Sequence, residues 1–122
     1  MAEILPLSHT LAVVPVSDFD TARRWYEQLF GVAPSNVPMP GILAEWRVTD
    51  TGWLQVTVDA ERAGRGLANF ASDDLDELRA ALQNRGLSPE EVVEANNNVR
   101  LSTVVDPDGN RITFIGGFRV VY

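Results

Sequence analysis

Residues 16–31 read VSDFDTARRWYEQLFG and contain a helix start, an amphipathic helix and a helix end. Ser17 or Asp18 can cap the helix, because their side chains accept hydrogen bonds from the free backbone N–H groups of the first turn. Apolar residues then recur at the spacing of one helix face, and Gly31 can end the helix in the left-handed conformation. The apolar segment 7–16 before it is rich in β-branched residues, which predicts a strand.

The same arrangement returns in residues 72–86, SDDLDELRAALQNRG. Here Asp73 or Asp74 is the expected cap and Gly86 the expected end. The Asp-apolar-Asp pattern recurs at an offset of 56 residues, which indicates an internal duplication. Around the two helices we expect a short strand at 67–72 and further strands at 41–50, 53–59, 92–95, 99–105 and 111–115. Loop 34–40 holds at most one short edge strand, and 51–52 forms a hairpin turn.

A β-α-β-β-β unit used twice predicts an α+β fold with two tandem βαβββ modules. The length of 122 residues suits one domain, with a first module at about 5–60 and a second at about 65–117. Residues 61–66 are the expected connector. We see no signal peptide and no apolar run near the roughly 18 residues that span a bilayer. We therefore expect a cytoplasmic protein that is not associated with a membrane.

The amino-acid composition excludes several reaction types and binding partners. Cys and Lys are both absent, which excludes thiolate chemistry, Cys-based metal sites and Schiff bases. The formal net charge of −7 makes nucleic acid an unsuitable partner. The acidic balance either serves solubility or favours cationic ligands.

Two segments resemble the glyoxalase/bleomycin resistance protein/dioxygenase superfamily, also called vicinal oxygen chelate. One runs from Val14 to Asp20 and continues through Trp25 to Gly31, and the other is DPDGNRI at 106–112. The resemblance covers essentially the whole chain. It implies curved sheets that close around a cavity. In metal-dependent members of that family, His, Glu or Gln side chains hold one divalent ion there, which polarises vicinal oxygens of the substrate.

Carried over to this sequence, the family's ligand positions fall on Leu11, Gln55, Leu67 and Thr113. Leucine has no donor atom, and one amide with one hydroxyl cannot hold a catalytic ion tightly. The resemblance therefore implies a member without metal or other cofactor, and it disfavours the family's metal-dependent enzymatic mechanisms.

Strand alternation extends this set of inward positions. His9 shares a strand face with Leu11, and it is either a shifted ligand, a general base or a partly exposed residue at the strand start. On the third strand, Trp46 or Glu45 faces inward, offering a stacking surface or a partner for a cation. The expected ligand-binding residues are His9, Leu11, Trp46, Trp53, Gln55, Leu67, Asn69, Arg111 and Thr113.

Three functions are compatible with these features. The first is a homodimeric protein that binds or sequesters a small cationic or aromatic molecule, similar to the bleomycin-resistance branch. The second is a lyase, isomerase or dioxygenase-type enzyme with an unorthodox site. The third is a non-catalytic accessory dimer domain, in which the apolar tail 118–122 packs on a partner subunit.

Overall fold

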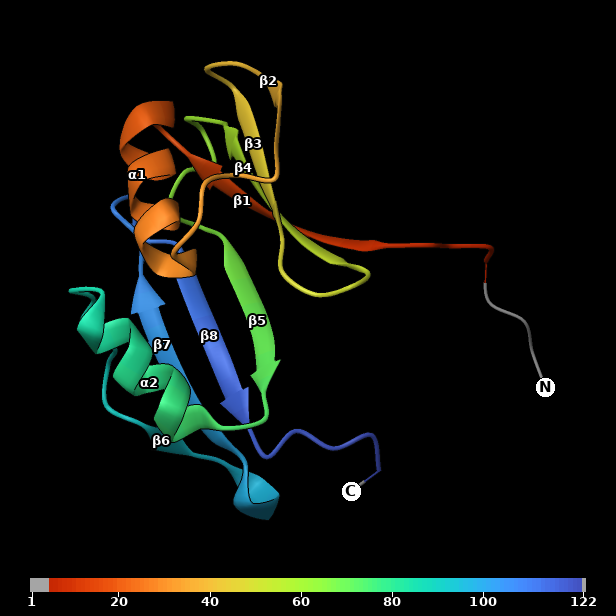
Figure 1. The fold of residues 1–122 in the computed structure, drawn as a ribbon, viewed down its shortest axis with the longest axis vertical. Helices are drawn as coiled ribbons and strands as arrows, with labels where there is room; N and C mark the ends of the chain where they lie inside the picture. The colour runs from red at the N-terminus through yellow and green to blue at the C-terminus, as the bar shows by residue number, and fades with distance from the viewer. Residues whose placement is uncertain (1–4, 122) are drawn as a thin grey trace.

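The computed structural model describes residues 5–121 and contains two four-stranded sheets, each covered on one face by a helix (Figure 1). The elements of the first module are β1 (Thr10–Val16), α1 (Phe19–Phe30), β2 (Asn36–Met39), β3 (Leu43–Arg47) and β4 (Gly52–Val58). Those of the second are β5 (Leu67–Ser72), α2 (Leu75–Asn84), β6 (Val93–Glu94), a 3-10 turn (Asn96–Asn98), β7 (Arg100–Val105) and β8 (Arg111–Gly116).

Both sheets have the same topology. Sheet A has the strand order β1-β4-β3-β2 and sheet B the order β5-β8-β7-β6. In each sheet the first strand pairs in parallel with the last, and the remaining pairs are antiparallel. The tandem βαβββ fold expected from the duplicated pattern is confirmed.

The helix boundaries follow from side-chain caps. The carboxylate of Asp18 accepts a hydrogen bond from Thr21 N at 2.9 Å, and that of Asp74 accepts from Glu77 N at 3.0 Å. Each satisfies a backbone N–H that has no partner within its helix. Gly31 ends α1 with φ 75°. The N-caps are therefore Asp18 rather than Ser17 in α1, and Asp74 rather than Asp73 in α2.

The first strand is shorter than the apolar segment predicts. It begins at Thr10 rather than at residue 7, because the last backbone bond at this end joins Thr10 N to Thr51 O. The preceding residues 5–9 are exposed and extend away from the body of the molecule (Figure 1). No helix in the described part of the chain is long and apolar enough to cross a bilayer.

One apolar core lies on the helix-facing sides of both sheets. Tyr26 and Trp46 are its largest fully buried side chains. Their rings lie 6.0 Å apart, a normal spacing for an aromatic contact. The buried residues of this core are Val14, Val16, Ala22, Tyr26, Leu29, Ala44, Trp46, Leu54, Val56, Ala68, Leu75, Leu82, Leu87, Val104, Ile112 and Phe114.

The DPDGN turn joins the two modules. Asn110 is fully buried, and its amide donates to Pro15 O and accepts from Gly66 N, both at 2.7 Å. The Asp106 carboxylate accepts from the Tyr26 hydroxyl at 2.8 Å. Burial, together with the Asp106 charge, raises the pKa of Tyr26 above its usual range, so the hydroxyl remains a donor. This motif therefore acts as a structural latch between β1, α1 and the connector.

Gly109 supplies the backbone conformation that the turn needs, with φ 101°. The positive φ expected from the sequence is confirmed, and it is a region that side chains with a Cβ rarely adopt.

Candidate functional site

The faces of the two sheets opposite the helices are open to solvent. Side chains of a strand alternate between faces, so every second residue of each strand lies on this side. Leu11, Val13 and Leu67 are 45%, 53% and 76% exposed there. These surfaces are called the open faces of sheets A and B below. They carry most of the residues that the sequence assigns to a ligand cavity.

On the open face of sheet A, Glu45 is the centre of a small polar cluster. Gln55 lies directly opposite it on β4, and Gln55 Nε2 donates to Glu45 Oε2 at 2.8 Å. Asn36 Nδ2 donates to the other oxygen at 3.1 Å. Two amides thus fix the orientation of one carboxylate. No ion pair of the described residues involves Glu45.

Apolar and aromatic residues surround this cluster. Trp53 precedes Gln55 on the same face of β4 and is half-buried, and Leu11 lies opposite Trp53 on β1. A hollow of about 300 Å³ lies further along this face. Val13 and Thr57 line it together with Arg65 and the Arg62–Asp59 ion pair. The mixture of apolar walls with a few fixed polar groups is typical of small-molecule sites.

The open face of sheet B carries neutral polar groups. The hydroxyls of Thr103 and Thr113 are 2.8 Å apart and share a hydrogen bond. Arg111 Nη2 lies 2.7 Å from Glu90 Oε1. Hydrogen bonding to the guanidinium lowers the pKa of Glu90, and the same contact raises the pKa of Arg111. The positive charge of Arg111, which is exposed, is therefore already paired with Glu90.

The four positions that correspond to the family's metal ligands do lie on the open faces. Leu11 and Gln55 are on sheet A, and Leu67 and Thr113 are on sheet B. Their donor chemistry does not fit a divalent ion, since two are hydrocarbon side chains and Thr113 already bonds Thr103. Within residues 5–121, no three His, Asp or Glu side chains are grouped as a metal site.

Two of the expected cavity residues are placed elsewhere, and both expectations are corrected. Trp46 is 1% exposed on the helix-facing side of β3, where its Nε1 donates to Val32 O at 3.0 Å. The register with β4 puts Glu45 on the open face instead. His9 lies before β1 in the exposed arm, and its Nδ1 is 2.9 Å from Ser8 Oγ.

The remaining residues fall into two groups. Leu11, Trp53 and Gln55 lie on sheet A, while Leu67, Asn69, Arg111 and Thr113 lie on sheet B. The role of Asn36 was not found from the sequence. Its partner Glu45 is nine residues away across an irregular strand pair, and the sequence carries no signal for that register shift.

Comparison with solved structures places the chain among known proteins. No protein-family model matches the sequence, and no curated protein does. A glyoxalase/bleomycin resistance protein from Catenulispora acidiphila DSM 44928 has 30% identity and a TM-score of 0.81, covering 88% of this chain and 96% of that one. TnmS3, an antibiotic-binding protein from Streptomyces sp. CB03234, has 25% identity and a TM-score of 0.71, with 93% and 98% covered.

A more distant structure shares the fold alone. A bleomycin-binding protein in complex with bleomycin has 17% identity and a TM-score of 0.74, and 92% of this chain and all of that chain are covered. The doubled βαβββ fold, the latch formed by the DPDGN turn and the 30% identity to the Catenulispora protein lead to one assignment. The chain belongs to the glyoxalase/bleomycin resistance protein superfamily.

Proposed function

We propose that this protein binds a small organic cation with an aromatic part on the open face of sheet A. The observation that carries the proposal is the Glu45 carboxylate, which two amides orient and no cation of the described residues neutralises. A carboxylate has about four acceptor positions, so oxygen lone pairs remain for a charged donor of the ligand.

The neighbours of Glu45 favour an aromatic ligand. Trp53 offers a ring on the same face of β4, and a cation near a Trp ring gains about 0.5–2 kcal/mol. Arg47 lies opposite Trp53 on β3, but its guanidinium turns to Asp50 O at 2.8 Å. The carboxylate and the ring are thus the groups that a positively charged ligand would contact.

Two of the similar proteins support the binding of a small molecule. TnmS3 binds an antibiotic, and the structure with bleomycin has the same fold. We infer that Leu11, Leu67 and Thr113 occupy the positions where the family's metal-dependent enzymes have ligands. A cytoplasmic location stays a prediction.

Replacing Glu45 by Gln is expected to weaken such a ligand about tenfold or more, because a charge-assisted hydrogen bond contributes about 1.5–3 kcal/mol. The measurement is a thermal-shift screen of aromatic cations, bleomycin among them, followed by calorimetry on the compounds that raise the melting temperature. Trp53→Ala and Gln55→Ala should also weaken binding while the protein stays folded.

Glu61→Gln, in the exposed connector, is the matched charge control and should leave the dissociation constant unchanged. Addition of a chelator should also have no effect. The proposal fails if no aromatic cation stabilises the protein, or if Glu45→Gln and Glu61→Gln behave alike.

We also propose that two copies associate so that each covers the open faces of the other. The open faces expose Leu11, Val13, Leu67 and Val105, and the arm 5–9 extends from the same protomer without covering them (Figure 1). Exposed apolar side chains that gather on one side of a protein often mark an interface. Association would convert an open sheet surface into an enclosed ligand cavity.

The double variant Leu11→Asp/Leu67→Asp is expected to be monomeric at micromolar concentration, whereas the wild type should have twice the mass of one chain. Buried, unpaired carboxylates would oppose association strongly. Light scattering coupled to gel filtration measures both masses. Val32→Asp, an exposed apolar residue on the other side of the molecule, should remain dimeric. A wild-type monomer would refute the proposal.

A further inference from the structure

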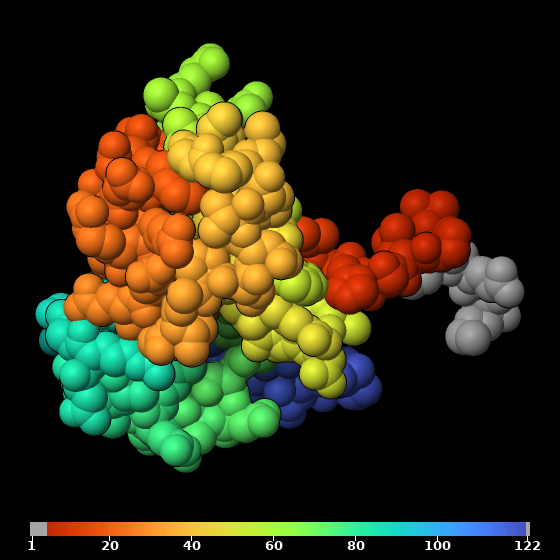
Figure 2. Space-filling view, turned by 45° about the horizontal axis from the view of Figure 1, so that its top comes forward, coloured from red at the N-terminus to blue at the C-terminus, as the bar shows by residue number. Residues whose placement is uncertain are grey.

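A groove separates the two modules on the helix side, across the sheets from the open faces. A cavity of about 450 Å³ lies between the end of α1 and α2, and a second of about 310 Å³ adjoins it beside β3. The two share Phe30, Ser72, Leu78 and Phe114 as lining residues. Figure 2 shows the hollow between the orange and yellow first module and the green second module.

Two aromatic pairs line this groove, one from each module. Phe30 and Trp46 have ring centroids 5.8 Å apart in the first module. Phe70 and Phe114 have centroids 6.0 Å apart in the second. Aromatic walls favour flat rings, and the volume of the larger cavity is within the range of small-molecule pockets, about 300–1,000 Å³.

The rim of the larger cavity is acidic. Asp73, Asp74 and Glu77 line it, against the single guanidinium of Arg85, which donates to Leu29 O at 2.6 Å. No ion pair of the described residues includes any of these three carboxylates.

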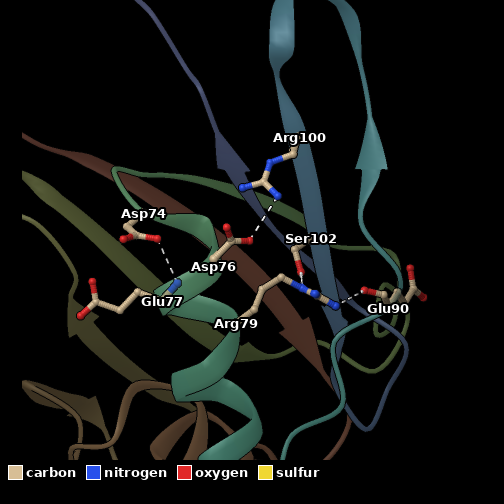
Figure 3. A network of polar contacts seen from close by, with 7 residues as sticks. All are labelled: Asp74, Asp76, Glu77, Arg79, Glu90, Arg100 and Ser102. Atoms are coloured by element: carbon tan, nitrogen blue, oxygen red, sulfur yellow. Dashed lines mark hydrogen bonds and ion pairs between the residues drawn. The ribbon is translucent and has the colours of Figure 1, made fainter.

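The arginines nearby do not neutralise Glu77. Its side chain points away from Arg79 and Arg100, which bind Ser102 and Asp76 instead (Figure 3). A cation in the cavity would therefore meet carboxylates that form no ion pair within residues 5–121, of which Asp74 also caps α2 through Glu77 N.

We propose that this inter-module groove is a second binding site, which takes a small flat aromatic molecule carrying a positive charge. Phe30 and Phe70, the half-buried members of the two pairs, contact the ring, and Asp73 and Glu77 attract the charge. The site is complete within one chain, so it does not depend on dimerisation. It is also distinct from the Glu45 cluster, since Glu45, Gln55 and Trp53 line neither cavity, although Arg47 at the end of β3 lines the smaller one.

The test uses (1-naphthylmethyl)ammonium as the probe, with neutral 1-naphthalenemethanol and anionic 1-naphthalenesulfonate as matched probes. Isothermal titration calorimetry on the full chain is expected to give the ammonium at least about tenfold tighter binding than the sulfonate. The double variant Asp73→Asn/Glu77→Gln should reduce this preference about tenfold.

A control with the same change in charge is Asp20→Asn/Glu91→Gln, whose exposed carboxylates lie outside the groove. It should retain the preference. Ala81→Trp fills the larger cavity from α2 and should weaken all three probes about tenfold or more. Circular dichroism checks that Ala81→Trp folds. If Ala81→Trp does not fold, the comparison of Asp73→Asn/Glu77→Gln with Asp20→Asn/Glu91→Gln tests the proposal.

Glu45→Gln separates this site from the open face of sheet A. Glu45→Gln removes only the contribution of the open face, so ammonium binding that remains in Glu45→Gln and falls about tenfold when Asp73→Asn/Glu77→Gln is added supports the groove. Three results would overturn the proposal: no ammonium binding by the wild type, equal weakening by the control, or loss in Glu45→Gln alone.

Discussion

Asn110→Ala is expected to lower the free energy of unfolding by about 3–5 kcal/mol, one of the largest effects of any single side-chain truncation in this protein. The amide is fully buried and bonds Pro15 O, Gly66 N and the Asp106 carboxylate. Its removal takes this partner from Pro15 O and Gly66 N, while the Asp106 carboxylate keeps the bond from Tyr26. Each buried polar group left unpaired costs about 1–3 kcal/mol.

Urea denaturation followed by circular dichroism measures this loss. Tyr26→Phe removes only one bond of the same cluster, to Asp106, and should cost about 1–2 kcal/mol. Asn84→Ala, an exposed Asn at the end of α2, should change stability by less than about 0.5 kcal/mol. If Asn110→Ala behaved like Asn84→Ala, the turn would not be a latch between the modules.

Gly64→Ala is expected to destabilise the fold by about 2–5 kcal/mol, although it adds a single methyl group. Gly64 has φ 86°, and a Cβ there would lie 2.3 Å from the carbonyl oxygen of Asp108. The contact is with backbone, so no side chain can rotate away. Either the connector or the DPDGN turn must move, which would strain the same latch.

Gly41→Ala provides the matched comparison. Its φ of 78° is similar, but a Cβ there meets no atom within 4 Å. This variant isolates the cost of a left-handed backbone, about 1–2 kcal/mol. Thermal unfolding of both variants should therefore give a clearly larger loss for Gly64→Ala. Equal losses would mean that the connector adapts without disturbing the turn.

The two proposed sites differ in whether a second copy of the chain is needed to complete them. The open face of sheet A has a fixed carboxylate but is enclosed only after a second copy covers it. The inter-module groove is formed by the two modules of one chain and has its carboxylates on the rim. Dimer-breaking variants should therefore affect ligands of the open face alone.

Local sequence patterns determined the fold. Asp caps and helical periodicity predicted both helices, because these signals act within one or two turns of the chain. The 56-residue offset between the two patterns predicted the doubled module. The resemblance to the superfamily predicted that Leu11, Gln55, Leu67 and Thr113 face one cavity, and the structure places them on the open faces of the two sheets. Alternation along the strands extended this set to neighbouring residues, and the absence of a bound metal stays a prediction.

Only the tertiary structure decided which residues meet. The register between β3 and β4 placed Glu45 on the open face and Trp46 in the core, and either choice satisfies alternation along a strand alone. Backbone pairing between β1 and the rest of the sheet ends at Thr10, so His9 lies outside the sheet. The latch and the inter-module groove depend on residues that are far apart in the sequence, such as Asn110 and Pro15, which are 95 positions apart. Such contacts form only when the two modules pack together, so no local pattern in the sequence can encode them.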